Sequence, residues 1–122
     1  MKNSWKLTVG VAGLLVIPAA ALAHAYPARE TPPVNAVLKS LPAEVTITFT
    51  ETINRHFSGI VVKGPTGKPV SQGEAILAQN NHKMLIVHLR RLNRSGRYTV
   101  FWHALSSDGH RTHGQYSFDI HL

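Results

Sequence analysis

The sequence of 122 residues contains no cysteine and only two methionines. Without cysteine, no disulfide can brace the chain and no thiolate can bind a metal, so packing alone must hold the fold. Soft sulfur ligands are equally scarce, because thioethers are limited to the two methionines. A metal site in this chain is therefore expected to consist mainly of nitrogen and oxygen donors.

The sequence also lacks an apolar run of the roughly 20 residues that a membrane-spanning helix needs. The apolar stretch at residues 7–17 is shorter, follows two lysines and leads to the small-residue motif Ala-Leu-Ala at 21–23. These are the three parts of a cleavable secretory signal. We expect residues 1–23 to be a signal peptide and residues 24–122 to form one exported domain, with no membrane insertion after cleavage.

Acidic residues are few, with 6 Asp and Glu against 13 Lys and Arg. Cleavage after residue 23 removes two lysines, which leaves 11 basic residues and a formal charge of +5. This charge would suit nucleic acid, but an exported protein rarely meets any, and only four arginines between residues 90 and 97 cluster. We therefore expect no nucleic-acid partner.

Helical periodicity is absent after the signal, whereas alternation of apolar and polar residues recurs. It is most regular at Glu44–Glu51 and Tyr98–Leu105, where every second residue is apolar, as in half-buried strands. About seven short strands separated by turns favour an all-β fold, an antiparallel Greek-key β-sandwich or barrel of immunoglobulin-like or cupredoxin-like form. The expected strands are 34–38, 44–51, 59–63, 73–78, 83–89, 98–105 and 115–122, with 24–33 as an extended lead-in.

All eight histidines follow the expected signal. Asp108 and His110 lie in a turn, one residue apart, and Gly109 allows a tight backbone between them. His24 would become the first residue after cleavage. Its free α-amine, with an ordinary pKa near 7.7–8, and its imidazole can then chelate one metal ion, which no internal histidine can do.

Nitrogen and carboxylate donors in a tetragonal array favour copper(II), which also binds most tightly among the divalent ions. Each part is ordinary alone, since an Asp-Gly-His sequence is commonly only a turn and a histidine after a signal is commonly incidental. Their coincidence in one small exported β-domain predicts a copper(II) site built from His24, Asp108 and His110.

The chain also resembles the periplasmic CopC/PcoC copper-resistance proteins, which are small β-sandwiches. The resemblance is strongest at 96–102 (GRYTVFW), 106–110 (SSDGH) and 114–118 (GQYSF). It implies a copper(II) site at the residues already named, His24, Asp108 and His110, joined by the strand-ending Glu51. It further implies a non-catalytic periplasmic carrier or buffer in copper homeostasis and resistance, with a membrane copper transporter or another periplasmic copper protein as partner.

Several alternatives remain open at this stage. An amino-terminal histidine paired with a second histidine also occurs in copper oxygenases, and the domain can equally be an interaction module whose histidines are incidental. His113 can bind copper, support a ligand or be merely exposed. His88 and His103, each on a polar strand face, can pair across a sheet as a second metal site. Some family members carry a methionine-rich loop for copper(I) near residues 63–74, where this chain has no methionine.

Overall fold

The computed structural model describes residues 24–122, so the expected signal peptide lies outside the described residues. The described chain forms eight β-strands and a 3₁₀ helix, η1. In this part of the chain, no helix is long and apolar enough to cross a membrane. The elements are β1 (Pro27–Thr31), β2 (Val37–Leu38), β3 (Glu44–Phe49), η1 (Arg55–Phe57), β4 (Gly59–Lys63), β5 (Ser71–Ala78), β6 (Asn81–Leu89), β7 (Gly96–Leu105) and β8 (Arg111–Ile120).

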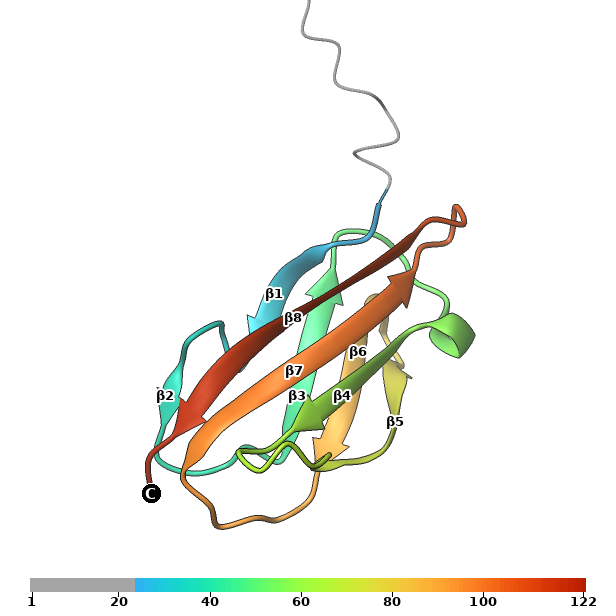
Figure 1. Cartoon of the computed structure of the whole chain (residues 1–122). Helices are drawn as coiled ribbons and strands as arrows, with labels where there is room; N and C mark the ends of the chain where they lie inside the picture. Colours follow the sequence, from blue (N-terminus) through green and yellow to red (C-terminus); the bar gives the residue numbers. More distant parts are fainter. Residues whose placement is uncertain (1–23) are drawn as a thin grey trace, which may run out of the picture.

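The strands form two four-stranded sheets that pack face to face (Figure 1). One sheet has the order β1-β3-β6-β5, and the other has the order β2-β8-β7-β4. The β5–β6 and β7–β8 connections join neighbours within a sheet, and the other connections between described strands cross to the opposite sheet. The predicted all-β Greek-key sandwich is confirmed, with eight strands in the described residues instead of about seven.

The first part of the domain differs from the prediction. Residues 24–33 are not a mere lead-in, because Pro27–Thr31 forms β1 and pairs antiparallel with β3 at the edge of the sheet. An edge strand tolerates the missing N–H of a proline at its first position. The strand predicted at 34–38 shrinks to Val37–Leu38, which pairs in parallel with the end of β8. The sandwich is therefore antiparallel, as predicted, except for this one parallel pair.

The last strand begins at Arg111, not at Gln115 as predicted. The residues that β8 directs inward at its start are Thr112 and Gly114, which carry no apolar signal. Gly114 lies opposite Trp102, and a Cβ atom at this glycine would stand 2.8 Å from the indole ring. The glycine therefore makes room for the tryptophan, and a pattern of apolar residues cannot reveal such a strand end.

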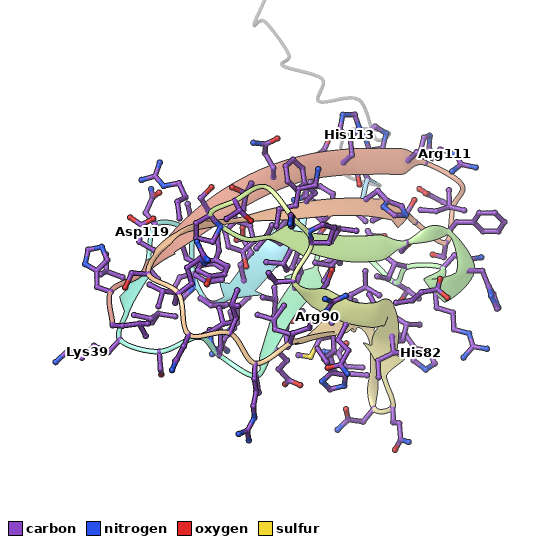
Figure 2. All side chains as sticks on the ribbon, turned by 60° about the horizontal axis from the view of Figure 1, so that its bottom comes forward. Lys39, His82, Arg90, Arg111, His113 and Asp119 are labelled. Carbon is purple, nitrogen blue, oxygen red and sulfur yellow. The ribbon has the colours of Figure 1, made fainter. Side chains whose placement is uncertain are left out.

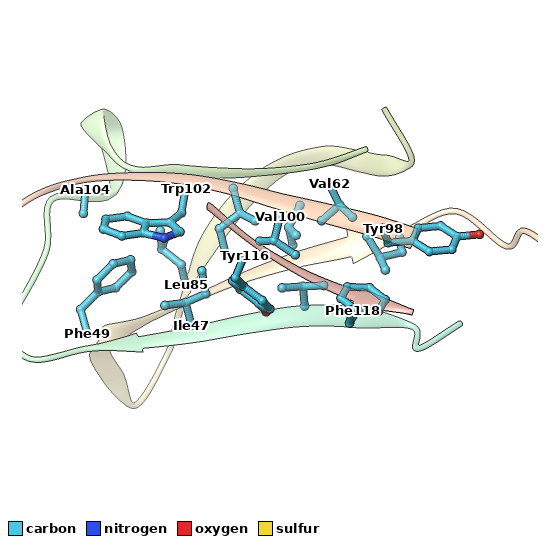
Figure 3. Close-up of a cluster of buried hydrophobic side chains, with 14 of the residues drawn as sticks. Ile47, Phe49, Val62, Leu85, Tyr98, Val100, Trp102, Ala104, Tyr116 and Phe118 are labelled. Atoms are coloured by element: carbon cyan, nitrogen blue, oxygen red, sulfur yellow. The ribbon is translucent and has the colours of Figure 1, made fainter. Parts of the chain in front are cut away.

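Apolar side chains from both sheets fill the space between them (Figure 3). The Phe49 ring meets the Trp102 ring edge to face at 5.4 Å between centroids. Tyr98 and Phe118 stack at 5.6 Å. The alternating residues predicted to face the core are all buried: Val45, Ile47, Phe49, Leu85, Val87, Leu89, Tyr98, Val100, Trp102, Tyr116, Phe118 and Ile120.

Two buried tyrosines differ in how their hydroxyl groups are satisfied. The Tyr98 hydroxyl donates a 2.7 Å hydrogen bond to the carbonyl oxygen of Arg94, an arrangement known as a tyrosine corner. The Tyr116 hydroxyl is buried without a hydrogen-bond partner among the described residues. Burial, together with the charge of Glu30, raises the pKa of Tyr116 well above its ordinary value. The Tyr116 hydroxyl therefore stays protonated in the core.

The two tyrosines form a matched pair for a stability test. Tyr98→Phe removes a satisfied hydrogen bond and leaves a carbonyl without its partner, so we expect a loss of about 1–3 kcal/mol in the free energy of unfolding. Tyr116→Phe removes an unpaired buried hydroxyl, so we expect no loss or a gain of about 1 kcal/mol. Urea unfolding of both variants checks this, and equal destabilisation by the two changes would contradict it.

Candidate metal centre

The loop between β7 and β8 is a tight turn that places two of the predicted ligands together. The Ser106 amide donates to the His110 carbonyl at 2.9 Å, and the Gly109 amide donates to the Ser106 carbonyl at 2.9 Å. Gly109 has a φ of +95°, a conformation that side-chain-bearing residues rarely adopt. The turn thereby holds Asp108 and His110 on one exposed end of the sandwich.

The Asp108 carboxylate is fixed within this turn. Its Oδ1 accepts a hydrogen bond from the Ser106 hydroxyl and lies 3.1 Å from His110 Nδ1. The His110 backbone N–H also points to Oδ1 at 3.4 Å. The Ser106 hydrogen bond, followed by those from His110, keeps the pKa of Asp108 below its ordinary value. Asp108 is therefore a carboxylate at neutral pH, and it orients the His110 ring.

The beginning of the domain is tied to the same end of the sandwich. Ala25 is completely buried, and its carbonyl accepts a 2.6 Å hydrogen bond from the Thr112 hydroxyl of β8. The Thr50 hydroxyl donates to the His24 carbonyl at 3.2 Å and lies 3.1 Å from the Tyr26 amide. These contacts restrict the position of the His24 backbone.

As a result, the rings of His24 and His110 lie 4.5 Å apart between centroids, tilted by 40°. Figure 1 shows the start of the described chain and the β7–β8 loop at the same end of the sandwich. The Nδ1 atom of His24 is 3.4 Å from the Tyr26 hydroxyl. The structure thus brings the three residues predicted from the sequence, His24, Asp108 and His110, to one place.

In their present conformations, these side chains do not form a complete metal-coordination site. Within residues 24–122, no group of three or more His, Cys, Asp or Glu side chains has an arrangement that would hold a metal ion. The His24 ring faces both His110 and Tyr26. Binding of an ion between the two imidazoles would thus require the exposed His110 and the half-exposed His24 to rotate.

Glu51 lies beside this cluster without being drawn into it. The sequence predicts that Glu51 ends its strand. In the structure β3 already ends at Phe49, so Glu51 lies two residues beyond it. The next residue, Thr52, accepts a 3.0 Å hydrogen bond from the Ser107 amide, which places Glu51 close to the turn. Glu51 is half-exposed, and its side chain makes no hydrogen bond or ion pair within residues 24–122.

Three strand histidines considered as further metal ligands, His88, His103 and His113, lie on the outer faces of the two sheets. His113 is exposed on β8. The alternative in which His88 pairs with His103 is excluded, because His88 belongs to β6 of one sheet and His103 to β7 of the other. Alternation along a strand tells which side of its own sheet a residue faces, but not which sheet the strand joins. His88 instead lies opposite Glu44, with 3.6 Å between Nδ1 and Oε2.

Sequence reasoning missed the residues that position the ligands. Ser106 and Thr112 are buried polar residues whose hydroxyls hold Asp108 and the Ala25 carbonyl. The one available signal was their placement. Ser106 directly precedes the Ser-Asp-Gly-His segment, Thr112 lies two residues after it, and both fit the inward-facing alternation of β7 and β8. A buried hydroxyl needs a hydrogen-bond partner. An inward-facing serine or threonine near a candidate ligand is therefore a candidate for the residue that positions that ligand.

The fold and the cluster define a class of protein: a small β-sandwich that presents two imidazoles and a carboxylate at one end. The CopC domain family matches residues 28–121. The chain belongs to this family. The resemblance to the CopC/PcoC proteins, strongest in three short stretches of the sequence, is confirmed over almost the whole described domain.

Individual relatives agree with this assignment. Protein YobA of Escherichia coli (strain K12) is 36% identical over 98 residues, which cover 80% of this chain and 79% of that protein. Copper transport protein CutJ of Bacillus subtilis is 32% identical over 98% of this chain, which spans only 22% of CutJ. The crystal structure of CopC from Methylosinus trichosporium OB3b superposes with a TM-score of 0.73 at 27% identity, covering 80% of this chain and 93% of that one.

Replacement of Ser106 tests how the turn holds its carboxylate. In Ser106→Ala, the largest cause of the depressed pKa of Asp108 is gone, so we expect that pKa to rise towards its ordinary value. A carboxyl-carbon NMR titration measures it. The pKa of Asp119, which the Arg97 guanidinium lowers from 3.1 Å away, serves as the internal control and stays unchanged. An unaltered Asp108 titration would contradict the role given to Ser106.

Proposed function

We propose that the protein is an exported copper(II)-binding protein that acts as a carrier or buffer in periplasmic copper homeostasis and resistance. The observation that carries the proposal is the approach of His24 to His110 at 4.5 Å, with Asp108 held 3.1 Å from His110. The names of its relatives, copper transport protein CutJ and copper resistance protein C, support copper as the cargo.

The amino terminus created by signal cleavage supplies the decisive donor. Once residues 1–23 are removed, the α-amine and the imidazole of His24 can close a chelate ring on one ion. His110 adds its Nε2, because its Nδ1 faces Asp108. Asp108 has one oxygen engaged with Ser106 and His110 and can offer the other to the metal. Glu51 is an outer oxygen donor at the edge of this set.

These donors select the oxidation state of copper. Imidazole, amine and carboxylate suit copper(II), whereas copper(I) prefers thiolate and thioether. After cleavage the chain has no cysteine, and Met84 is its only sulfur. Met84 lies on β6, in the sheet opposite to the one that carries His110's hairpin. The proposed cargo is therefore copper(II).

Exposure of the site fits storage and transfer of the ion better than catalysis. Asp108 and His110 are both exposed, so a partner can reach the bound ion directly. The partners proposed are an inner-membrane copper transporter or another copper protein of the same compartment. The role that we propose is therefore carriage or buffering of the ion, without catalysis.

A single added residue tests the chelate. We expect the mature protein with one extra alanine before His24 to bind copper(II) about 10²- to 10⁴-fold more weakly, because the amine and imidazole no longer act as one tethered pair. Competition titration measures the affinity, and electron paramagnetic resonance reports the number of nitrogen donors. Unchanged affinity and spectrum would refute the chelate.

A matched pair of histidine variants tests the second ligand. His110→Ala should weaken copper(II) binding by at least about 10- to 100-fold. This is the loss usually caused by removing a residue that only supports a metal ligand, and His110 is proposed to be a ligand itself. His121→Ala removes an exposed histidine that follows the far end of β8, so it should leave the affinity unchanged. Equal effects of the two changes would show that copper binds histidines without regard to position.

A further inference from the structure

The β7–β8 hairpin carries a second pair of histidines, separate from the turn. His103 on β7 lies directly opposite His113 on β8, and both side chains are exposed. They occupy the outer face of their sheet, because the neighbouring residues Trp102, Ala104 and Thr112 are buried on the inner side. Figure 2 shows His113 projecting from the outer side of β8, with His82 on the far side of the sandwich.

The hydrogen-bond ladder determines how close these two side chains come. The Ser106 amide donates to the His110 carbonyl, so these two residues form a hydrogen-bonded pair. In an antiparallel ladder, hydrogen-bonded and non-hydrogen-bonded pairs alternate. The register from this pair to Gly96 opposite Ile120 is continuous. His103 and His113 are therefore a non-hydrogen-bonded pair, the kind in which opposite side chains approach most closely.

Two other pairs of the same kind show that side chains on this face meet across the strands. The Thr99 hydroxyl lies 3.2 Å from the Ser117 hydroxyl. Arg97 Nε donates to Asp119 Oδ1 at 3.1 Å. Both pairs belong to the same register and the same outer face as the histidines. Side chains of pairs of this type can therefore reach one another across the hairpin.

The His103 ring is turned towards the neighbouring strand β4. There it lies over Gly59, where an added Cβ atom would stand 2.8 Å from Cε1 of the ring. Neither imidazole makes a hydrogen bond or ion pair within residues 24–122, so rotation of His103 towards His113 breaks no such contact. The two rings can then offer one nitrogen each to a single ion.

We propose that His103 and His113 form a second binding site for copper(II), independent of the cluster at the end of the sandwich. Two imidazoles suit copper, zinc and nickel ions, and copper(II) binds most tightly among these. Water completes the coordination. With two protein donors and no chelating amine, this site is the weaker of the two, and it shares no ligand with His24, Asp108 or His110.

Copper(II) titration of the mature protein tests the proposal. The wild-type protein should bind one ion tightly and a second one more weakly. His103→Asn and His113→Asn should each weaken the second binding event by at least about tenfold, and leave the tight one unchanged. His82→Asn, which removes an exposed histidine of the other sheet, is the matched control and should alter neither. A weak site that survives both hairpin variants, or that is equally lost in the control, overturns the proposal.

Two further measurements test the second site independently of the copper(II) site in the proposed function. With the tight site disabled by an alanine before His24 together with His110→Ala, the weak site should remain, and copper(II) should broaden the imidazole NMR signals of His103 and His113 together. Gly59→Ala should displace the His103 ring without removing a donor, so binding should persist or tighten. If copper(II) does not broaden the signals of His103 and His113 together, the second site is refuted. If the protein fails to bind the tight ion but still binds the weak one, only the proposed function is refuted. Metal-free thermal unfolding of each variant confirms that the fold is retained.

Discussion

The buried hydrogen bond from the Thr112 hydroxyl to the Ala25 carbonyl, 2.6 Å long, is the contact on which the candidate site depends. It joins the first residues of the domain to the start of its last strand. Because Ala25 is fully buried there, His24 has to lie near the start of β8, next to the turn that holds His110. The proposed centre is therefore assembled from the start of the described domain and the turn before its last strand, and the packed sandwich holds these two segments together.

This construction explains how a small, exposed site can still be specific. The turn residues are fixed locally, with Ser106 and Gly109 setting the positions of Asp108 and His110. The His24 side is fixed by contacts with both sheets, through Thr50 and Thr112. An ion that bridges the two sides would bind only the folded domain, so loading would stabilise the fold by mass action. At the same time, the exposure of Asp108 and His110 would keep a bound ion within reach of a partner.

Much of the fold was predictable because alternation records burial. The inward residues of β3, β7 and β8, such as Ile47, Val100 and Phe118, are apolar and were identified correctly. Prediction failed where pairing, not hydrophobicity, makes the strand. β1 and β2 exist because β3 and β8 offer them free edges, and the start of β8 is hidden because Thr112 and Gly114 face inward. The same limit explains why the sequence alone left a pairing of His88 with His103 open, although the two residues belong to different sheets.

By itself, the sequence determined the chemistry that this protein can offer: histidine and carboxylate donors, no cysteine, a tight Asp-Gly-His turn, and a histidine placed after an expected signal. Those properties are local, and they survive in any fold. Only the tertiary structure decided which donors meet, because strand pairing and buried hydroxyls act between residues far apart in the chain. It brought His24 to His110, left Glu51 at the margin, and set His103 opposite His113.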